Sequence, residues 1–303
     1  MTGGCGSPWQ RAIGAVLCLF VLICAACGPA SEAGDREPCR RIVSLSPNIT
    51  EILFAVGLGD RLVGATRFCN YPPEAALLPR VGGYYDTNVE AVVALEPDLV
   101  VMLPAHESAG SVLERVGIQC LAVGNETIGE ILSSITTIGR RCGAADSAAA
   151  VRASIERRIE SVRRLTSASD RPSTLVVVSR AYGSSPAGIC AAGRGTFYDE
   201  LLEAAGGRNA IDSRVPAYPE LSMEGMLHLD PEVIIEIVPA ADARRLGLQR
   251  ITGGWKGAAE LRAVRTGRVT ILTGDHASIP GPRLVLLLEE FAEAISPGVL
   301  GGR

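Results

Sequence analysis

Residue types that support common enzyme chemistry are scarce in this chain. Aromatic residues make up 4% of its 303 residues, and histidine occurs three times, as His106, His228 and His276. Because hydrolytic metal centres and acid–base sites are often built on clustered histidines, this scarcity disfavours a metallohydrolase. A site that combines His106, His276 and a carboxylate is an arrangement of this kind that stays open.

The glycine-rich and nucleophile motifs of several large enzyme classes are also missing. Residues 193–195 (GRG) lack the third glycine of a dinucleotide-binding loop, and residues 253–256 (GGWK) lack the frame of a phosphate-binding loop. No Gly-x-Ser-x-Gly sequence is present. A net charge of -4 and the lack of a basic run argue against a nucleic-acid partner.

The overall composition is that of a globular protein. Hydrophobic residues reach 47% and charged residues 20%, which argues against disorder. A chain of 303 residues exceeds one ordinary domain and suits two lobes, each with its own core.

The first part of the chain has the pattern of an export signal. Arg11 precedes an apolar run over residues 12–26, which ends in small residues directly before Cys27. The run is short for a bilayer span but typical of a secretory signal. The pattern predicts a lipoprotein signal peptide over residues 1–26, acylation of Cys27 and a tether over residues 27–39. A cleaved signal without lipid, or an N-terminal anchor, stays open, and each version places the mature chain outside the cytoplasm.

Cysteine usage fits that location. After Cys27 an odd number of cysteines remains: Cys39, Cys69, Cys120, Cys142 and Cys190. An oxidising compartment permits disulfides, so at least one of these thiols is free or paired between molecules. No Cys-x-x-Cys spacing occurs among them, which disfavours a structural zinc site. The pairing stays open.

Downstream of residue 40, short apolar runs alternate with helical stretches. This alternation, with short connections, predicts mostly parallel sheets flanked by helices. The expected strands are residues 41–45, 62–66, 99–103, 119–123, 175–179, 233–237 and 269–272, and the expected helices are 49–56, 89–95, 111–116, 196–205, 223–227 and a C-terminal helix with an apolar stripe from Leu284 to Ile295.

Residues 146–165 break this rhythm. Val151, Ile155 and Ile159 fall on one helical face, whereas arginines crowd elsewhere. About twenty residues of helix would span about 30 Å. We interpret the segment as one long helix, residues 146–166, that joins an N-terminal lobe (40–145) to a C-terminal lobe (167–303). The alternative, a helix that covers one large sheet, stays open.

One pattern of residues occurs twice. Residues 88–103 (NVEAVVALEPDLVVML) and 222–237 (SMEGMLHLDPEVIIEI) align without a gap, and Glu90 then corresponds to Glu224. Each copy is typical of a helix, a turn and a buried strand. Because equivalent positions of two lobes lie far apart unless the lobes face each other directly, the repeat argues against Glu90 and Glu224 as a catalytic pair.

The few aromatic residues gather in the predicted loops. Ligands of open parallel sheets bind beyond the carboxyl ends of the strands, and aromatic rings there are suited to stacking on a flat or bulky ligand. For Tyr71 and His276, a structural role in a turn stays equally open. The candidate ligand-binding residues are Phe68, Cys69, Tyr71, Tyr84, Tyr85, His106, Tyr182, Tyr218, Asp275 and His276.

Four stretches occur in a recognisable order: FCNYPPEA (68–75), PRVGGYYDTNVEAVVALEPDLV (79–100), RVPAYPELSMEGMLHLDPEVII (214–235) and GDHASIPGPRL (274–284). Together they resemble the periplasmic cobalamin-binding proteins of ABC importers and their ferric-siderophore and haem-binding relatives. The resemblance implies a class III periplasmic binding protein: two Rossmann-like lobes with mostly parallel sheets joined by a single long α-helix. It also implies a ligand in the cleft between the lobes.

The resemblance implies a partner as well. In that family an acid on each lobe tip docks onto arginines of the two identical membrane subunits of the importer, and these acids correspond to Glu90 and Glu224. The residues alone offer a second role, because each glutamate lies two positions after a helix-capping Asn88 or Ser222. Both roles are compatible. The expectation is a monomeric, non-enzymatic binding protein.

The implied ligand is a corrinoid, most directly cobalamin, and no intrinsic cofactor is expected. The cleft aromatics of the family correspond to Cys69 or Tyr71, Tyr84 and Tyr218, and the acid of its final loop corresponds to Asp275. A later basic residue of that loop corresponds to Ile279, which departs from the pattern.

Two alternatives stay open. The first is a haem or ferric siderophore, for which Cys69 or His276 would be a metal ligand. The second is an extracytoplasmic metal-dependent enzyme that acts through Asp275 and His276.

Overall fold

A computed structural model describes residues 1–2, 39–183, 185–211 and 215–301 of the chain. Residues 38–303 form one compact unit. The predicted signal peptide from residue 3 onward, the acylated Cys27 and the tether up to residue 38 lie outside the described residues. Within the described part, every helix is too short or too polar to cross a membrane.

The sheet formed before the long helix is entirely parallel. Its strands lie in the order β2–β1–β3–β4. The central strands β1 and β3 are buried along their whole length and apolar apart from Ser44, as expected for strands covered on both faces. The elements of this half are β1 (Ile42–Ser44), α2 (Pro47–Ala55), β2 (Leu62–Ala65), α3 (Val89–Ala94), β3 (Leu99–Met102), α4 (Glu107–Arg115), β4 (Gln119–Ala122) and α5 (Ile128–Arg141).

The second sheet is mixed. Strands β10, β9 and β5 are parallel neighbours, and the short β7 pairs in parallel with β5. On the other side of β5, β6 pairs with it in antiparallel orientation, and β8 in turn pairs antiparallel with β6. The elements are β5 (Ser173–Ala181), β6 (Ala187–Ala191), α7 (Phe197–Ala204), β7 (Arg208–Asn209), β8 (Glu220–Leu221), α8 (Met223–Leu229), β9 (Val233–Ile237), α9 (Ala240–Leu246), α10 (Leu248–Gly254), α11 (Arg262–Arg265), β10 (Val269–Leu272) and α12 (Leu284–Ile295).

Short 3-10 turns complete the description: η1 (Gly59–Arg61), η2 (Pro73–Leu77), η3 (Pro104–His106), η4 (Trp255–Ala258) and η5 (Asp275–Ser278).

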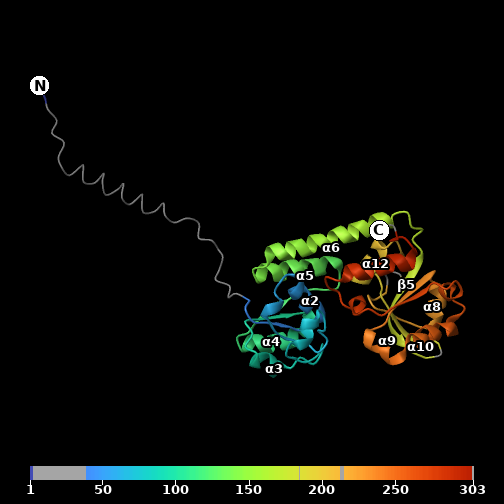
Figure 1. Ribbon diagram of the computed structural model, residues 1–303, viewed down its shortest axis with the longest axis horizontal. Helices are drawn as coiled ribbons and strands as arrows, with labels where there is room; N and C mark the ends of the chain where they lie inside the picture. The colour runs from blue at the N-terminus through green and yellow to red at the C-terminus, as the bar shows by residue number, and fades with distance from the viewer. Residues whose placement is uncertain (3–38, 184, 212–214, 302–303) are drawn as a thin grey trace. The chain divides into compact units, whose positions relative to one another are not determined.

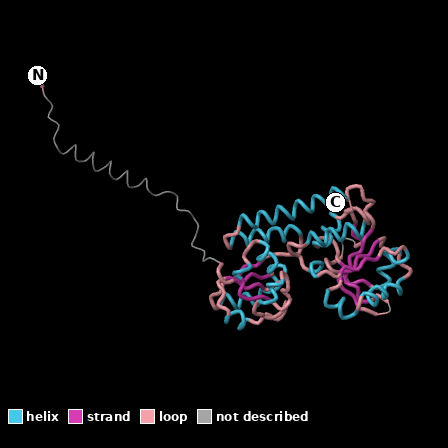
Figure 2. Tube along the Cα trace, viewed as in Figure 1, coloured by secondary structure: helices cyan, strands magenta, loops and turns pink. Residues whose placement is uncertain are grey.

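A single long helix, α6 (Ala145–Leu165), extends from one sheet to the other (Figures 1 and 2). It packs against α5 and α12. Its apolar face, including Ile155, Ile159 and Val162, is buried in one continuous core with both helices. The arrangement is therefore two mostly parallel sheets joined by one long helix. The exact lobe boundaries stay a prediction, because residues 38–303 cluster as one unit.

A disulfide joins Cys39 to Cys142. It links the segment before β1 to the residue that ends α5, and both cysteines are buried in the core shared with α6. Cys69, Cys120 and Cys190 are free thiols. The structure thus resolves the pairing that the sequence left open.

The expected elements recur with small shifts at their ends. Strands β9 and β10 agree with the predicted ranges at both ends, whereas helix α4 begins at Glu107, four positions before the predicted start. Helix α5 was not predicted, although Ile128, Ile131, Ile135 and Ile138 form a buried stripe on it. Its Thr127 cap, which accepts a hydrogen bond from the backbone N–H of Glu130, was the missed signal.

Candidate functional site

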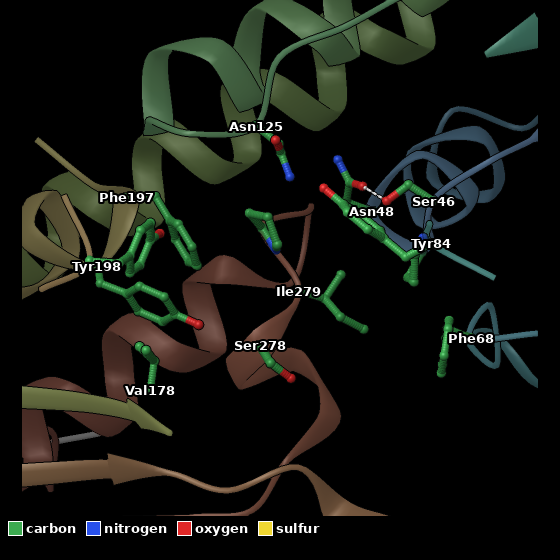
Figure 3. Close-up of a pocket in the computed structure, with 13 residues that line it drawn as sticks. Ser46, Asn48, Phe68, Tyr84, Asn125, Val178, Phe197, Tyr198, Ser278 and Ile279 are labelled. Atoms are coloured by element: carbon green, nitrogen blue, oxygen red, sulfur yellow. Dashed lines mark hydrogen bonds between the residues drawn. The ribbon is translucent and has the colours of Figure 1, made fainter. Parts of the chain in front are cut away.

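A cavity of about 420 Å³ lies between the two sheets, within the range of small-molecule sites. Figure 3 shows Phe68 and Tyr84 on one side of it, Phe197 and Tyr198 on the other, and Ile279 between them. Most of the lining is aromatic or aliphatic. The lining residues are Ser46, Pro47, Asn48, Phe68, Tyr84, Asn125, Val178, Phe197, Tyr198, Tyr218, Ser278, Ile279 and Pro280.

Phe68 is held at the cavity by the loop that follows β2. The guanidinium group of Arg80 donates hydrogen bonds to the carbonyl oxygens of Thr66, Cys69 and Ala76 at 2.8, 3.0 and 2.8 Å. These bonds tie both ends of the loop to one side chain. The Phe68 ring is 52% exposed and free to meet a ligand.

Tyr84 is held by the next loop. The Arg67 backbone N–H donates to the Gly82 carbonyl at 2.9 Å, and the Arg67 guanidinium donates to the Asp86 carboxylate at 2.5 Å. This bond is the main reason why the pKa of Asp86 lies below its usual value. Gly82 has φ 105°, a conformation that favours glycine, and it allows the tight return that brings Tyr84 to the cavity.

The opposite wall is the start of helix α7. Thr196 caps this helix by accepting a hydrogen bond from the Asp199 backbone N–H. The rings of Phe197 and Tyr198 lie 4.0 Å apart, and the Tyr198 hydroxyl donates to the Ala277 carbonyl at 3.0 Å. Because the hydroxyl hydrogen is already engaged, Tyr198 offers the cavity its ring and an acceptor oxygen rather than a donor.

Asn48 supplies a polar group that lacks a partner. The Ser46 hydroxyl donates to Asn48 Oδ1 at 2.5 Å (Figure 3), whereas the buried Asn48 Nδ2 has no hydrogen-bond partner in the described structure. A buried unsatisfied donor costs free energy. Asn48 Nδ2 is therefore a natural donor for an acceptor atom of a bound molecule, and Asn125 adds a second amide to the same wall.

A second compartment of about 380 Å³ adjoins the first, since Pro47, Phe68, Ser278 and Ile279 line both. Its walls carry charged side chains, which the main cavity lacks. The residues found in it alone are Asn70, Tyr71, Pro239, Ala240, Ala241, Arg244, Asp275 and Arg283.

Tyr71 and Arg283 form one wall of this compartment. The Arg283 guanidinium carbon lies 3.8 Å from the centre of the Tyr71 ring. Arg283 also donates two hydrogen bonds, of 2.9 and 2.5 Å, to the carboxylate of Glu51 on α2. Burial raises the pKa of Glu51 against the opposing effect of Arg283. The pair joins the two halves of the chain beside the cavity.

Tyr85 and His106 lie at a separate hollow of about 340 Å³, beside α3 and α4. The Tyr84 ring separates this hollow from the main cavity, because it lines both and packs edge-on against Tyr85 and His106. His106 is buried, and its Nδ1 accepts a hydrogen bond from the Leu103 backbone N–H. Tyr85 and His106, two of the predicted ligand-binding residues, line this separate hollow and not the main cavity, and their contact with a ligand stays a prediction.

Three other predicted ligand residues point elsewhere. Cys69 is 1% exposed, and its sulfur lies 3.1 Å from Thr66 Oγ1 beneath the loop. His276 Nε2 lies 3.0 Å from Glu290 Oε2 on α12. Tyr182 stacks on the buried Arg180 guanidinium at 4.8 Å and lines neither compartment. Packing or local pairing engages each of these side chains in the structure, and the role of the three residues in ligand binding stays a prediction.

Tyr218 does line the main cavity, as predicted. Its partial burial raises the pKa of its hydroxyl to about 12. The phenol therefore keeps its proton at physiological pH.

The two predicted docking glutamates are exposed at the start of helices α3 and α8. Each follows a side-chain cap: Asn88 Oδ1 accepts from the Ala91 backbone N–H, and Ser222 Oγ accepts from the Gly225 backbone N–H. Neither Glu90 nor Glu224 belongs to any of the three hollows described above.

Several lining residues escaped the sequence interpretation, chiefly Asn48, Asn125, Phe197 and Tyr198. Asn48 stood in a strand-to-helix turn, a position from which parallel sheets present ligand-binding groups. That signal was available. The sequence around Phe197 and Tyr198 is typical of the buried face of a helix. Only the packing of the two halves brings them to a cavity.

Comparison with known proteins indicates the family of this chain. Residues 42–275 match the family described as periplasmic binding protein. The chain is 32% identical over 273 residues to an uncharacterized ABC transporter substrate-binding lipoprotein of Bacillus subtilis, which covers 86% of this chain and 81% of that protein. It is 29% identical over 278 residues to the vitamin B12-binding protein of Vibrio cholerae, with 91% and 94% coverage.

Solved structures share the architecture. The periplasmic vitamin B12-binding protein BtuF of Vibrio cholerae superposes with a TM-score of 0.71 at 28% identity, over 85% of this chain and 97% of that chain. A periplasmic heme-binding protein from Pseudomonas aeruginosa gives a TM-score of 0.74 at 26% identity, over 85% and 93%. The chain therefore belongs to the periplasmic binding protein family and has its class III, BtuF-like fold.

Proposed function

We propose that this protein is an extracytoplasmic, lipid-anchored binding protein that captures a corrinoid, most directly cobalamin, and delivers it to an ABC importer. The observation that carries the proposal is the cavity between the two sheets, to which both halves of the chain contribute aromatic rings. Rings on opposite walls are suited to hold a broad macrocycle by its faces.

The chemistry of the lining supports binding rather than catalysis. Aromatic, aliphatic, hydroxyl and amide side chains surround the main cavity. The candidate catalytic pair is divided, because Asp275 faces the second compartment whereas His276 pairs with Glu290. His106 and His276 share none of the three hollows. We therefore favour a non-enzymatic role.

The polar groups of the cavity suit a ligand with many peripheral acceptors. Asn48 Nδ2 lacks a partner, and Asn125 lies on the same wall. A corrin ring carries carboxamide groups around its edge, whose carbonyl oxygens accept hydrogen bonds from amide donors. Two adjoining compartments also offer room for a macrocycle and an appended group.

Haem or a ferric siderophore is the second candidate. The similarity to a heme-binding protein favours it. Against it, two of the side chains suited to ligate iron are engaged elsewhere: Cys69 is buried and His276 pairs with Glu290. Tyrosinate is a known haem ligand, and Tyr84 and Tyr218 line the main cavity. A corrinoid brings its own axial ligand and needs none from the protein.

The exposed positions of Glu90 and Glu224 support their role in docking to the importer. Both carboxylates are exposed and lie outside the ligand compartments. Exposed carboxylates accept paired hydrogen bonds from arginine, and two equivalent acids suit a homodimeric permease. We propose that the monomeric protein docks through these acids, and that acylated Cys27 keeps it at the membrane.

Calorimetric titration of the purified protein tests the ligand assignment. The ligands are cyanocobalamin, cobinamide, haem and ferrichrome, a ferric hydroxamate siderophore. We expect one-to-one binding of a corrinoid without turnover. If neither corrinoid gives a heat of binding and haem or ferrichrome does, the second candidate replaces the first.

A further inference from the structure

The two helices that carry Glu90 and Glu224 resemble each other in the burial of their residues as well as in sequence. Between residues 88–100 and 222–234, corresponding positions have the same degree of burial throughout. Both helices begin at a side-chain cap, with bonds of 2.9 Å at Asn88 and 3.1 Å at Ser222. The two halves of the chain therefore present small surfaces with the same burial pattern, which differ most at the exposed Ala94 and His228.

The ends of these helices are also alike. Glu96 and Asp230, at corresponding positions, have φ 46° and 36°, in the left-handed region that non-glycine residues rarely adopt. A buried proline follows each, and then the strand β3 or β9 in the interior of its sheet. Each helix is capped at its start and turns sharply into an interior strand. Its exposed face is therefore held in a fixed position.

That exposed face carries an apolar side chain beside each acid. Val93 and Leu227 follow Glu90 and Glu224 by three residues, which places them one helical turn away on the same side. Each is 39% exposed. The intervening Val92 and Met226 are fully buried. Neither glutamate has a hydrogen-bond or ion-pair partner within the described structure.

We propose that Val93 and Leu227 are the apolar anchors of importer docking. Each packs into an apolar depression on one membrane subunit, next to the arginine that pairs with the neighbouring glutamate. This inference rests on the proposed function. An exposed ion pair alone contributes little to binding, whereas an apolar contact beside it excludes water and strengthens the attraction between the charges.

The presence of two equivalent surfaces indicates the kind of partner. Two equivalent surfaces match a partner that carries two equivalent sockets, as a homodimer does. A second copy of this chain is a poor occupant, because contact through these faces would bring the unpaired Glu90 and Glu224 carboxylates together. The partner that these two surfaces fit therefore carries a cation next to an apolar depression, repeated by a two-fold axis, and we assign this role to the permease dimer.

Single substitutions on the full protein test the anchors. Val93→Ser and Leu227→Ser keep Glu90 and Glu224 and shorten only the apolar contact. Val116→Ser and Leu248→Ser are matched controls, since these aliphatic residues are 58% and 55% exposed and lie outside α3 and α8. The probe is the purified corrinoid importer of the source organism in lipid nanodiscs, with binding followed by surface plasmon resonance.

We expect each anchor variant to raise the Kd for the importer about tenfold, and the double variant about a hundredfold. The control variants should bind like the unaltered protein, and cyanocobalamin affinity should be the same in all. Glu90→Ala and Glu224→Ala serve as the reference for loss of docking.

The outcomes separate this inference from the proposed function. If the unaltered protein fails to bind the importer, the proposed function is overturned together with the inference. If the glutamate variants lose binding while Val93→Ser and Leu227→Ser bind normally, only the apolar anchors are overturned. Equal losses in the anchors and the controls also overturn them, since the contact would then be non-specific.

Discussion

The Arg283 guanidinium group, just before α12, forms a two-bonded ion pair with Glu51 on α2, and the Tyr71 ring covers it. The two charged side chains are 17% and 2% exposed. The pair joins residues that are far apart in the chain, on either side of α6. It also forms part of the wall of the second compartment. Opening of the cleft on this side would separate two buried charges, which favours small movements of the two halves.

Removal of one partner of this pair should destabilise the protein strongly. Glu51→Met leaves the partly buried Arg283 without its partner, and such losses cost up to about 3–5 kcal/mol when the charge is fully buried. The double variant Glu51→Met/Arg283→Met should recover most of that loss, because two apolar side chains avoid the desolvation of both charges. Urea denaturation of the single and double variants measures the coupling. A single variant as stable as the unaltered protein would contradict the role of the pair.

Tyr84 and Tyr85 form a matched pair of neighbours for a test of the cavity. Tyr84 lines the main cavity, whereas Tyr85 is 91% exposed and does not. Tyr84→Ala should weaken corrinoid binding about tenfold or more, because a stacking face is lost. Tyr85→Ala should change it little. Calorimetric titration with cyanocobalamin checks both, and equal losses would show that the loop, not the ring, matters.

Asn48 should affect affinity more than stability. Asn48→Leu removes the unpartnered Nδ2 donor, and it also removes the hydrogen bond that Asn48 accepts from Ser46. These two effects on the ligand-free protein oppose each other, so the free energy of unfolding should change by about 1 kcal/mol or less. Affinity for cyanocobalamin should fall about tenfold, since the ligand loses a donor. Thermal unfolding without ligand and calorimetry with it distinguish a ligand contact from a purely structural role.

The raised pKa of Tyr218 predicts a pH effect in alkaline solution. The pKa is about 12 in the folded chain and 10.0 without the surrounding structure. Folding therefore favours the protonated phenol, so the stability that it contributes is present below pH 10 and is lost as the pH rises toward 12. The difference in tyrosinate absorbance between the unaltered protein and Tyr218→Phe should titrate near the higher value. Titration at the lower value would contradict the burial of this hydroxyl.

The Cys39–Cys142 disulfide should contribute to stability, because it closes a loop with a sequence separation of 103. Loops of about that length are stabilised by up to about 4.7 kcal/mol in the chain-entropy description. The double variant Cys39→Ser/Cys142→Ser should lower the urea midpoint without a large change in ligand affinity. Cys120→Ser, at a free thiol, is the control. Equal stability of the disulfide variant and the control would contradict the prediction.

Much of the architecture follows from the sequence, for reasons that lie in local periodicity. Alternation of short apolar runs with helical stretches predicted parallel sheets, and the amphipathic stretch at 146–165 predicted the helix seen as α6. The repeat at 88–103 and 222–237 predicted two equivalent helix–turn–strand units, which the structure has as α3–β3 and α8–β9. These features depend on residues close together in the chain.

The site depended on the tertiary structure. Phe68, Tyr84 and Tyr218 were predicted from their loops, but Phe197 and Tyr198 reach the same cavity only because α7 packs across from those loops. These contacts are between residues distant in sequence, which no local pattern specifies.

The same distinction applies to the predicted residues that lie outside the main cavity. A loop position indicated that Cys69 and His276 were available to a ligand, whereas in the structure Cys69 is buried and His276 pairs with Glu290. By itself, the sequence determined the repeated units and their outward acids, because helix caps and periodicity are local. Only the tertiary structure decided which side chains share the cavity, since that depends on how two separately built sheets pack around one long helix.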